Sequence, residues 1–292
     1  MLTPKYPFLV GIDSDGCAFD TMELKHKECF IPPLIKHYAL QGVSRFAREA
    51  AEFVNLYSKS RGCNRFHALI EQLDWLGRRP EVRRRGYQVA APSGVLKWVR
   101  RMEAEKKGLA NPTLEAAARE SNDPDLVRAL AWSKEVNENV AKIVEHVPPF
   151  PFVRECLEKL KTVADVLVVS ATPGAALQKE WQEHDIARYV AAICGQEVGS
   201  KAEILASAIE QGKYAPGRTL MIGDAPGDRK AAEINSALFF PINPGSEEES
   251  WKRCFEEGLE RFLDGNFSGS YQQSLIAEFE KRLPEKPPWP IE

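Results

Sequence analysis

The feature of this sequence that most restricts its fold is a series of short apolar runs, each of which ends at residues typical of turns. Buried strands of a parallel sheet have this length and this continuous apolar composition. Five runs of this kind can be recognised along the chain, although the third is weaker than the others. They are Phe8–Ile12, Val166–Val169, Val190–Cys194, Thr219–Ile222 and Ala237–Phe240.

The stretches between the later runs have the apolar spacing of helices. Strands that alternate with helices of this length are typical of a parallel sheet covered by helices on both faces. We therefore expect the α/β class, with a Rossmann-like doubly wound parallel sheet whose ligands bind at the carboxyl ends of the strands. The helical stretches are Pro151–Lys161, Pro173–Ile186, Ser200–Gln211 and Gly227–Asn235.

The segment from residue 21 to residue 147 departs from this alternation. It is rich in Arg, Ala, Glu and Leu, and its amphipathic stretches include Phe66–Leu76, Gly94–Lys106 and Asp125–Val144. We expect an all-helical domain at 21–147, inserted into a core domain formed by residues 1–20 and 148–292. A last helix around Tyr271–Leu283 is expected to dock on the core, with a partner-binding face as the alternative. The Pro-rich end, Pro287–Glu292, is expected to be a loose tail.

Composition narrows the classes of partner. A net charge of -3 indicates neither nucleic acid nor an anionic membrane, and no apolar run approaches the roughly 20 residues that span a bilayer. The six cysteines are scattered without a CxxC pair, as free thiols are in a reducing cytoplasm. The five histidines lack the spacing of a zinc site. We expect a cytoplasmic protein that binds a small molecule, and the sequence leaves the oligomeric state open.

Chemically competent side chains follow the predicted strands. Because the carboxyl ends of parallel strands lie at one edge of the sheet, these side chains should meet there. Several carboxylates so close together would repel one another without a cation, and hard carboxylate oxygens suit Mg²⁺. The residues of this predicted site are Asp13, Asp15, Ser170, Lys201, Asp224 and Asp228.

Four of these segments resemble the signature motifs of the haloacid dehalogenase superfamily, in order and in rough spacing. They are Asp13-Ser14-Asp15-Gly16, Ser170, Lys201, and Gly223-Asp224-Ala225-Pro226-Gly227-Asp228. The resemblance covers residues 5–20 and 148–245. The helical insertion is similar to the C1-type cap of phosphoglycolate phosphatases and beta-phosphoglucomutases. One difference is Cys17, which stands where the superfamily usually has Thr, and we interpret it as a packing residue.

The resemblance implies a role for each acidic residue. Asp13 would attack phosphorus and form an aspartyl-phosphate, and Asp15 would act as general acid and then as general base. Asp13, Asp224 and the backbone carbonyl of Asp15 would bind Mg²⁺. For Asp228 two alternatives stay open, because it could contribute to the metal site or hold Lys201.

The remaining core residues would bind the phosphoryl group. Ser170 and neighbouring backbone N–H groups, with Ala171 as the next residue, are expected to contact its oxygens. Lys201 would neutralise charge on the phosphoryl group and on Asp13.

Two spots in the helical insertion resemble the substrate-facing parts of the capped relatives. Lys25 stands where the mutases have His, and Arg61-Gly62-Cys63-Asn64-Arg65 is similar to their Gly-x-x-Arg loop. Arg61 and Arg65 are therefore expected to bind an anionic group at the far end of the substrate. The alternative is an ordinary helix with solvated arginines.

The function expected from these residues is hydrolysis of a small phosphate monoester with Mg²⁺ as cofactor. The presence of Asp15 disfavours dehalogenase and phosphonatase chemistry, since those enzymes lack an acid at this position. A sugar-phosphate mutase is one alternative, against which Lys25 counts. A non-catalytic phosphometabolite-binding protein is another, against which the complete set of acidic residues counts. The sequence does not identify the substrate.

Overall fold

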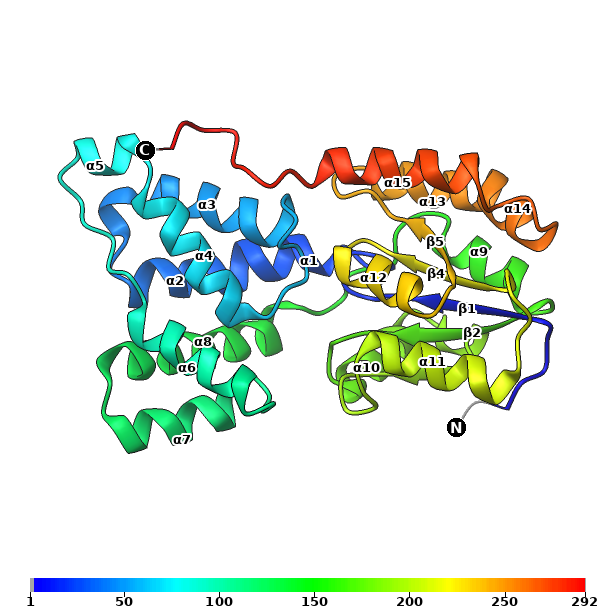
Figure 1. Cartoon of the computed structure of the whole chain (residues 1–292), viewed down its shortest axis with the longest axis horizontal. Coiled ribbons are helices and arrows are strands. Elements are labelled where there is room, and N and C mark those ends of the chain that lie inside the picture. The colour runs from blue at the N-terminus through cyan, green and yellow to red at the C-terminus, as the bar shows by residue number, and fades with distance from the viewer. Residues whose placement is uncertain (1–2, 292) are drawn as a thin grey trace. The chain divides into compact units, whose positions relative to one another are not determined.

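The computed structural model of this protein describes residues 3–291, which form two compact units (Figure 1). The core unit comprises residues 3–22 and 146–283, and the cap unit comprises residues 23–145 and 284–291. The chain therefore passes between the units three times. In the described part of the chain, no helix combines the length and the apolar character needed to span a membrane.

A five-stranded parallel sheet in the order β3-β2-β1-β4-β5 forms the centre of the core unit. Its middle strand β1 pairs with β2 on one side and with β4 on the other, so that Val10 lies opposite both Val166 and Leu220. The predicted α/β class with a parallel sheet is confirmed. The strands are β1 (Phe8–Ile12), β2 (Ala164–Val169), β3 (Ala192–Cys194), β4 (Thr219–Gly223) and β5 (Leu238–Pro241).

Helices cover both faces of this sheet, because successive strand side chains point to opposite sides. Val10 and Ile12 belong to the apolar cluster on the first face, whereas Leu9 belongs to the cluster on the second. The helices of the first cluster are α9 (Val153–Leu160), α10 (Gly174–Glu183), α13 (Glu247–Arg253) and α14 (Leu259–Leu263). Those of the second are α11 (Lys201–Gly212), α12 (Pro226–Ile234) and α15 (Ser270–Arg282), and α15 also contributes Leu275 to the first cluster.

The last helix, α15, docks on the core unit as the sequence predicts. Its residues Leu275 and Phe279 are buried, and the ring of Phe279 packs edge-on against Phe239 of β5 with centroids 5.8 Å apart. The contacts of α15 therefore stabilise the edge of the sheet at which β5 lies.

The cap unit has its own apolar core, in which Phe66 packs edge-on against Trp98 and Trp132. Residues 23–145 contain helices and no strand, as expected for the insertion. The helices that follow the crossing helix α1 (Thr21–Leu24) are the π-helix η1 (Lys25–Phe30), α2 (Ile31–His37), the 3₁₀ helix η2 (Gln41–Val43), α3 (Ser44–Leu56), α4 (Arg65–Gly77), α5 (Pro80–Arg84), α6 (Ser93–Ala104), α7 (Asn111–Ser121) and α8 (Pro124–Ile143).

The expectation of a loose tail at Pro287–Glu292 is wrong for residues 287–291, which belong with 284–286 to the cap unit, and Glu292 lies outside the described residues. The Trp289 ring lies edge-on to Phe53 at a centroid distance of 5.6 Å, and the Arg79 guanidinium lies 4.3 Å from the Trp289 centroid. The backbone N–H of Lys59 donates to the carbonyl of Pro284 at 3.3 Å. The proline content suggested a segment without tertiary contacts, but the Trp289 ring packs this segment against Phe53.

Candidate active site

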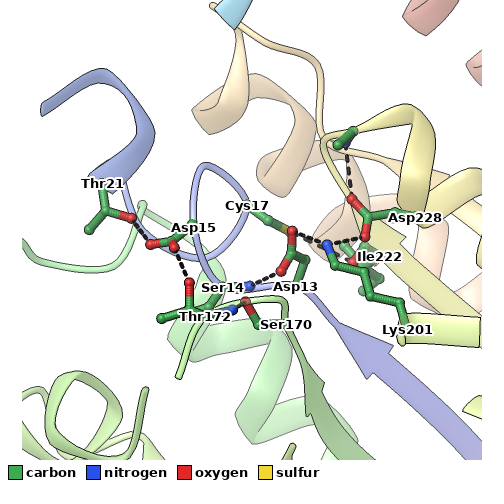
Figure 2. Close-up of polar contacts among 11 residues, drawn as sticks. Asp13, Ser14, Asp15, Cys17, Thr21, Ser170, Thr172, Lys201, Ile222 and Asp228 are labelled. Carbon is green, nitrogen blue, oxygen red and sulfur yellow. Dashed lines mark hydrogen bonds and ion pairs between the residues drawn. The ribbon is translucent and has the colours of Figure 1, made fainter. Parts of the chain in front are cut away.

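The carboxyl ends of β1, β2 and β4 bring the predicted core residues together. Asp13 directly follows β1, and its backbone N–H donates to the carbonyl of Ile222 at 3.0 Å, which continues the pairing of β1 with β4. Lys201, the first residue of α11, places its ammonium 2.7 Å from Asp13 Oδ2 and 2.6 Å from Asp228 Oδ1. Figure 2 shows Asp13 beside this ammonium, with Asp228 on its other side.

Three buried carboxylates meet in this site. Asp13, Asp224 and Asp228 each place an oxygen within 4.8 Å of the others, and they are 5%, 1% and 0% exposed. Lys201 forms ion pairs with two of them, Asp13 and Asp228. A set of buried carboxylate oxygens this close together fits a hard divalent cation such as Mg²⁺.

Burial dominates the electrostatics of these groups. It raises the pKa of Asp13 to about 6, against the lowering effect of Lys201 and with a further raising effect of Asp228. Burial raises the pKa of Asp228 in the same way. Burial alone would lower the pKa of Lys201, but the two neighbouring carboxylates outweigh it and raise that pKa above its ordinary value. Lys201 therefore stays charged at neutral pH.

The structure shows what Asp228 contacts, which the sequence left open. One oxygen accepts from Lys201, and the other accepts the backbone N–H of Ala225 at 3.0 Å, where α12 begins. A side chain at position 223 would clash here, because an added Cβ would lie 2.4 Å from Asp228 Cβ. Gly223 thus allows Asp228 to lie against the end of β4, where it holds Lys201.

Two threonines that the sequence analysis missed hold Asp15. The Thr21 hydroxyl donates to Asp15 Oδ1 and the Thr172 hydroxyl donates to Oδ2, each at 2.5 Å (Figure 2). Gly16, with φ of 74°, turns the backbone directly after Asp15. The sequence signal for Thr172 was its position two residues after Ser170, at the same strand end.

Ser14, between the two aspartates, anchors their loop to α10. Its buried hydroxyl donates to Glu180 at 3.0 Å and accepts from the indole N–H of Trp181 at 2.9 Å. Its backbone N–H donates to Asp13 Oδ1 at 2.8 Å. This anchor was also missed, because the sequence shows Trp181 only as a helix residue.

The loop after β2 carries the predicted phosphoryl-binding residues. Ser170 is buried, and its backbone N–H donates to the carbonyl of Cys194 at 3.0 Å. Its hydroxyl accepts the backbone N–H of Thr172 at 3.3 Å. Ala171 is exposed, so the loop is open to solvent at that residue.

Cys17 has the surroundings of a packing residue. It is fully buried, its sulfur lies 3.7 Å from the carbonyl oxygen of Ile222, and its own carbonyl accepts the indole N–H of Trp251 at 2.7 Å. Burial and the neighbouring carboxylates raise the pKa of Cys17. These contacts favour a neutral thiol that packs beneath the motif.

The three predicted cap residues differ in their surroundings. Lys25 is half-buried in the π-helix η1. Arg61 is 4% exposed and donates to the carbonyl of Leu56 at 2.9 Å, which favours a structural role within the cap unit. Arg65 donates to Ser133 Oγ at 3.0 Å and to Asn137 Oδ1 at 2.7 Å.

Arg65, which is half-buried, differs from the buried Arg79 of the cap unit. Its guanidinium lies 5.2 Å from the centroid of Phe30, and burial lowers its pKa. Within residues 3–291 no carboxylate forms an ion pair with Arg65, whereas Arg79 contacts Glu49 at 2.6 Å. Arg65 is therefore a desolvated cation that neutral acceptors hold in place.

The sequence model of one protein family, the haloacid dehalogenase-like hydrolases, matches residues 97–237 of this chain. The matched segment contains Ser170, Lys201, Asp224 and Asp228, and the structure adds Asp13, which lies outside it but bonds to Lys201. Over this segment, which is just under half of its length, the chain is similar to the haloacid dehalogenase-like hydrolases. No curated protein matches the sequence.

Solved structures of haloacid dehalogenase-like proteins resemble the chain at low sequence identity. A hydrolase of this family from Streptococcus pneumoniae is 14% identical and has a TM-score of 0.47, over 88% of this chain and 97% of that one. A predicted phosphatase from Clostridium acetobutylicum is 14% identical with a TM-score of 0.45, over 89% and 100%. A predicted phosphoglycolate phosphatase from Haemophilus somnus is 16% identical with a TM-score of 0.43, over 83% and 88%.

Proposed function

We propose that this haloacid dehalogenase-like hydrolase cleaves a small phosphate monoester through an aspartyl-phosphate on Asp13. The observation that carries the proposal is a buried nucleophile, Asp13, bonded to a permanently charged Lys201, with a second carboxylate two residues away. A nucleophile beside a fixed cation and an acid suits phosphoryl transfer, in which positioning and charge stabilisation supply most of the catalysis.

The reaction would proceed in two displacements. A carboxylate oxygen of Asp13 bonds to phosphorus while the bond to the leaving oxygen breaks, and Asp15 gives that oxygen a proton. Asp15 then takes a proton from water, whose oxygen bonds to phosphorus while the bond to Asp13 breaks. Lys201 offsets the negative charge of the phosphoryl oxygens in both steps, and Ser170 with the loop after it would bind them.

Asp13, Asp224 and the backbone carbonyl of Asp15 would hold Mg²⁺. When bound, the cation would neutralise charge on the phosphoryl group. Asp228 would act through Lys201, and its hydrogen bonds to Lys201 and to the N–H of Ala225 support this role.

On the substrate side, Arg65 would bind an anionic group of the substrate, and Lys25 would lie on the same cap unit. The support for Arg65 is its desolvated charge without an acidic partner among residues 3–291. A free cysteine set also supports a reducing, cytoplasmic location for the enzyme.

Replacement of the nucleophile tests the proposed function. Asp13→Asn removes the attacking carboxylate and should abolish Mg²⁺-dependent phosphate release from a panel of monoesters. The matched control is Asp264→Asn, the same chemical change at an exposed residue just after α14, which should leave turnover as in the wild type. Phosphate release by Asp13→Asn at the wild-type rate would contradict the proposal. Isomerisation of glucose 1-phosphate without phosphate release would favour a mutase instead.

A further inference from the structure

The carboxylate of Asp15 is held by one hydroxyl on each oxygen, and the two hydroxyls come from different segments of the core unit. Thr21 lies where the chain leaves the core unit, and Thr172 lies in the loop after β2 (Figure 2). We propose that Thr172 is a positioning residue that fixes Asp15 for proton transfer to the leaving group. The inference rests on the proposed phosphatase function.

Both backbone groups of Thr172, its N–H and its carbonyl, form hydrogen bonds. Its N–H donates to Ser170 Oγ at 3.3 Å, and its carbonyl accepts the N–H of Gln196 at 3.1 Å. Two residues on, the N–H of Gly174 donates to a Glu197 carboxylate oxygen at 3.0 Å. The loop after β2 is thus bonded along its length to the segment after β3, and the Thr172 hydroxyl is presented from a fixed backbone.

The close approach of these two segments depends on Gly195. A Cβ added there would lie 2.4 Å from the backbone nitrogen of Gly174 and 2.7 Å from the carbonyl oxygen of Thr172. Both neighbours are backbone atoms, which cannot rotate away as a side chain can. The absence of a side chain at position 195 therefore allows the loop to bring Thr172 within reach of Asp15.

The contacts of Thr172 also lie entirely in the core unit. Its partners Asp15, Ser170 and Gln196 all belong to residues 3–22 and 146–283. Thr21 differs in its position, because it lies only two residues before Glu23, where the cap unit begins. Thr172 is thus the donor to Asp15 that is held by contacts within the core unit.

This contact matters because a general acid works only within hydrogen-bond reach of the leaving oxygen. A displacement of about 1 Å can cost on the order of 10²-fold in rate. Without Thr172, Oδ2 of Asp15 would lose the hydroxyl that holds it, and the carboxylate could turn away from its position. The loss should be large for a leaving group that needs a proton and small for one that leaves readily as an anion.

The test compares two aryl esters whose leaving groups differ in basicity. Phenyl phosphate needs protonation of its leaving oxygen more than para-nitrophenyl phosphate does. With saturating Mg²⁺, Thr172→Val should lower kcat/KM for phenyl phosphate roughly 10- to 100-fold. The fold-loss on the nitrophenyl ester should be smaller by a factor of about ten. Thr172→Ser keeps the hydroxyl and should restore the wild-type ratio of the two values.

A matched control is Thr113→Val in the cap unit, where the lost hydroxyl donates to the carbonyl of Gly108 at 2.8 Å. It should leave the ratio unchanged. Melting curves identify misfolding, and Thr172→Ala replaces the valine variant if that variant does not fold. An equal loss on both esters, or failure of Thr172→Ser to restore the ratio, overturns this inference and leaves the proposed function intact. If the wild type releases phosphate from neither ester, the proposed function fails and the inference fails with it.

Discussion

At the scale of single residues, the site is governed by three buried carboxylates around one ammonium group. Asp13 and Asp228 bond to Lys201, and Asp224 lies within 4.8 Å of both. Burial favours the neutral form of the two bonded carboxyls. A bound cation favours their charged form, so protons and metal should compete for this cluster.

This competition predicts a pH dependence set by Mg²⁺. The protonated Asp13 can neither attack phosphorus nor bind a cation, and its pKa of about 6 lies above the usual range. At low Mg²⁺, kcat/KM should therefore fall as the pH drops through about 6. Higher Mg²⁺ should move this acid limb of the pH profile to lower pH, because the cation binds and stabilises the deprotonated form of Asp13. Profiles measured at two Mg²⁺ concentrations check this, and an acid limb at the same pH in both would contradict it.

The sequence predicted which residues meet in the site but not how their side chains pair. Asp13, Ser170 and Asp224 were predictable because each follows a strand, and parallel strands end at one edge. The contacts of Asp228 with Lys201 and of Asp15 with Thr172 depend on loop conformations that no periodic pattern records. The anchoring of Ser14 by Trp181 was not predictable for the same reason.

At the scale of elements, the loops after β2 and β3 are joined by hydrogen bonds into one frame around Ser170 and Thr172. The β3 strand, Ala192–Cys194, is shorter than the run from Val190 to Cys194 that the sequence predicted. Beyond it, the segment 194–197 bonds to the loop that carries Ser170 and Thr172. The central strand β1 was predicted to the residue because it is buried on both faces, whereas an edge strand such as β3 has a weaker apolar pattern.

This frame predicts a specific effect of adding one methyl group. Gly195→Ala would place a carbon 2.4 Å from the backbone nitrogen of Gly174, so the two loops must separate. Overpacking of this kind costs about 1–3 kcal/mol in the free energy of unfolding, and kcat/KM should fall because Ser170 and Thr172 move. The matched control is Gly108→Ala, which meets nothing within 4 Å. Thermal melts and phosphatase assays check both variants, and equal behaviour of the two would contradict the prediction.

At the scale of the whole molecule, two separate apolar cores are joined by three passages of the chain. The core unit is built around the sheet, and the cap unit is built around helices with aromatic contacts such as Phe66 to Trp98. The third passage runs from Leu283, which is buried in the core unit, to Pro284, whose carbonyl accepts from Lys59 of the cap unit. Residues 284–291 therefore add to the stability of the cap, although they follow the last helix of the core unit.

Replacement of Trp289 tests this role of the C-terminal segment. Trp289→Ala would remove the ring that packs against Phe53 and lies beside the Arg79 guanidinium. Trp289 is half-buried, so the loss should be about 1–2 kcal/mol, below the 3–5 kcal/mol of a fully buried aromatic residue.

Hydrogen exchange followed by mass spectrometry locates this effect. Amides of α3 and α5 should exchange faster in Trp289→Ala, since Phe53 belongs to α3 and Arg79 directly precedes α5, while those of β1 and β4 should keep their protection. Glu285→Ala is the control, because it removes only the exposed ion pair with Lys59 and should leave exchange in α3 and α5 unchanged. Unchanged protection of α3 and α5 in Trp289→Ala would show that the segment contributes nothing to the cap.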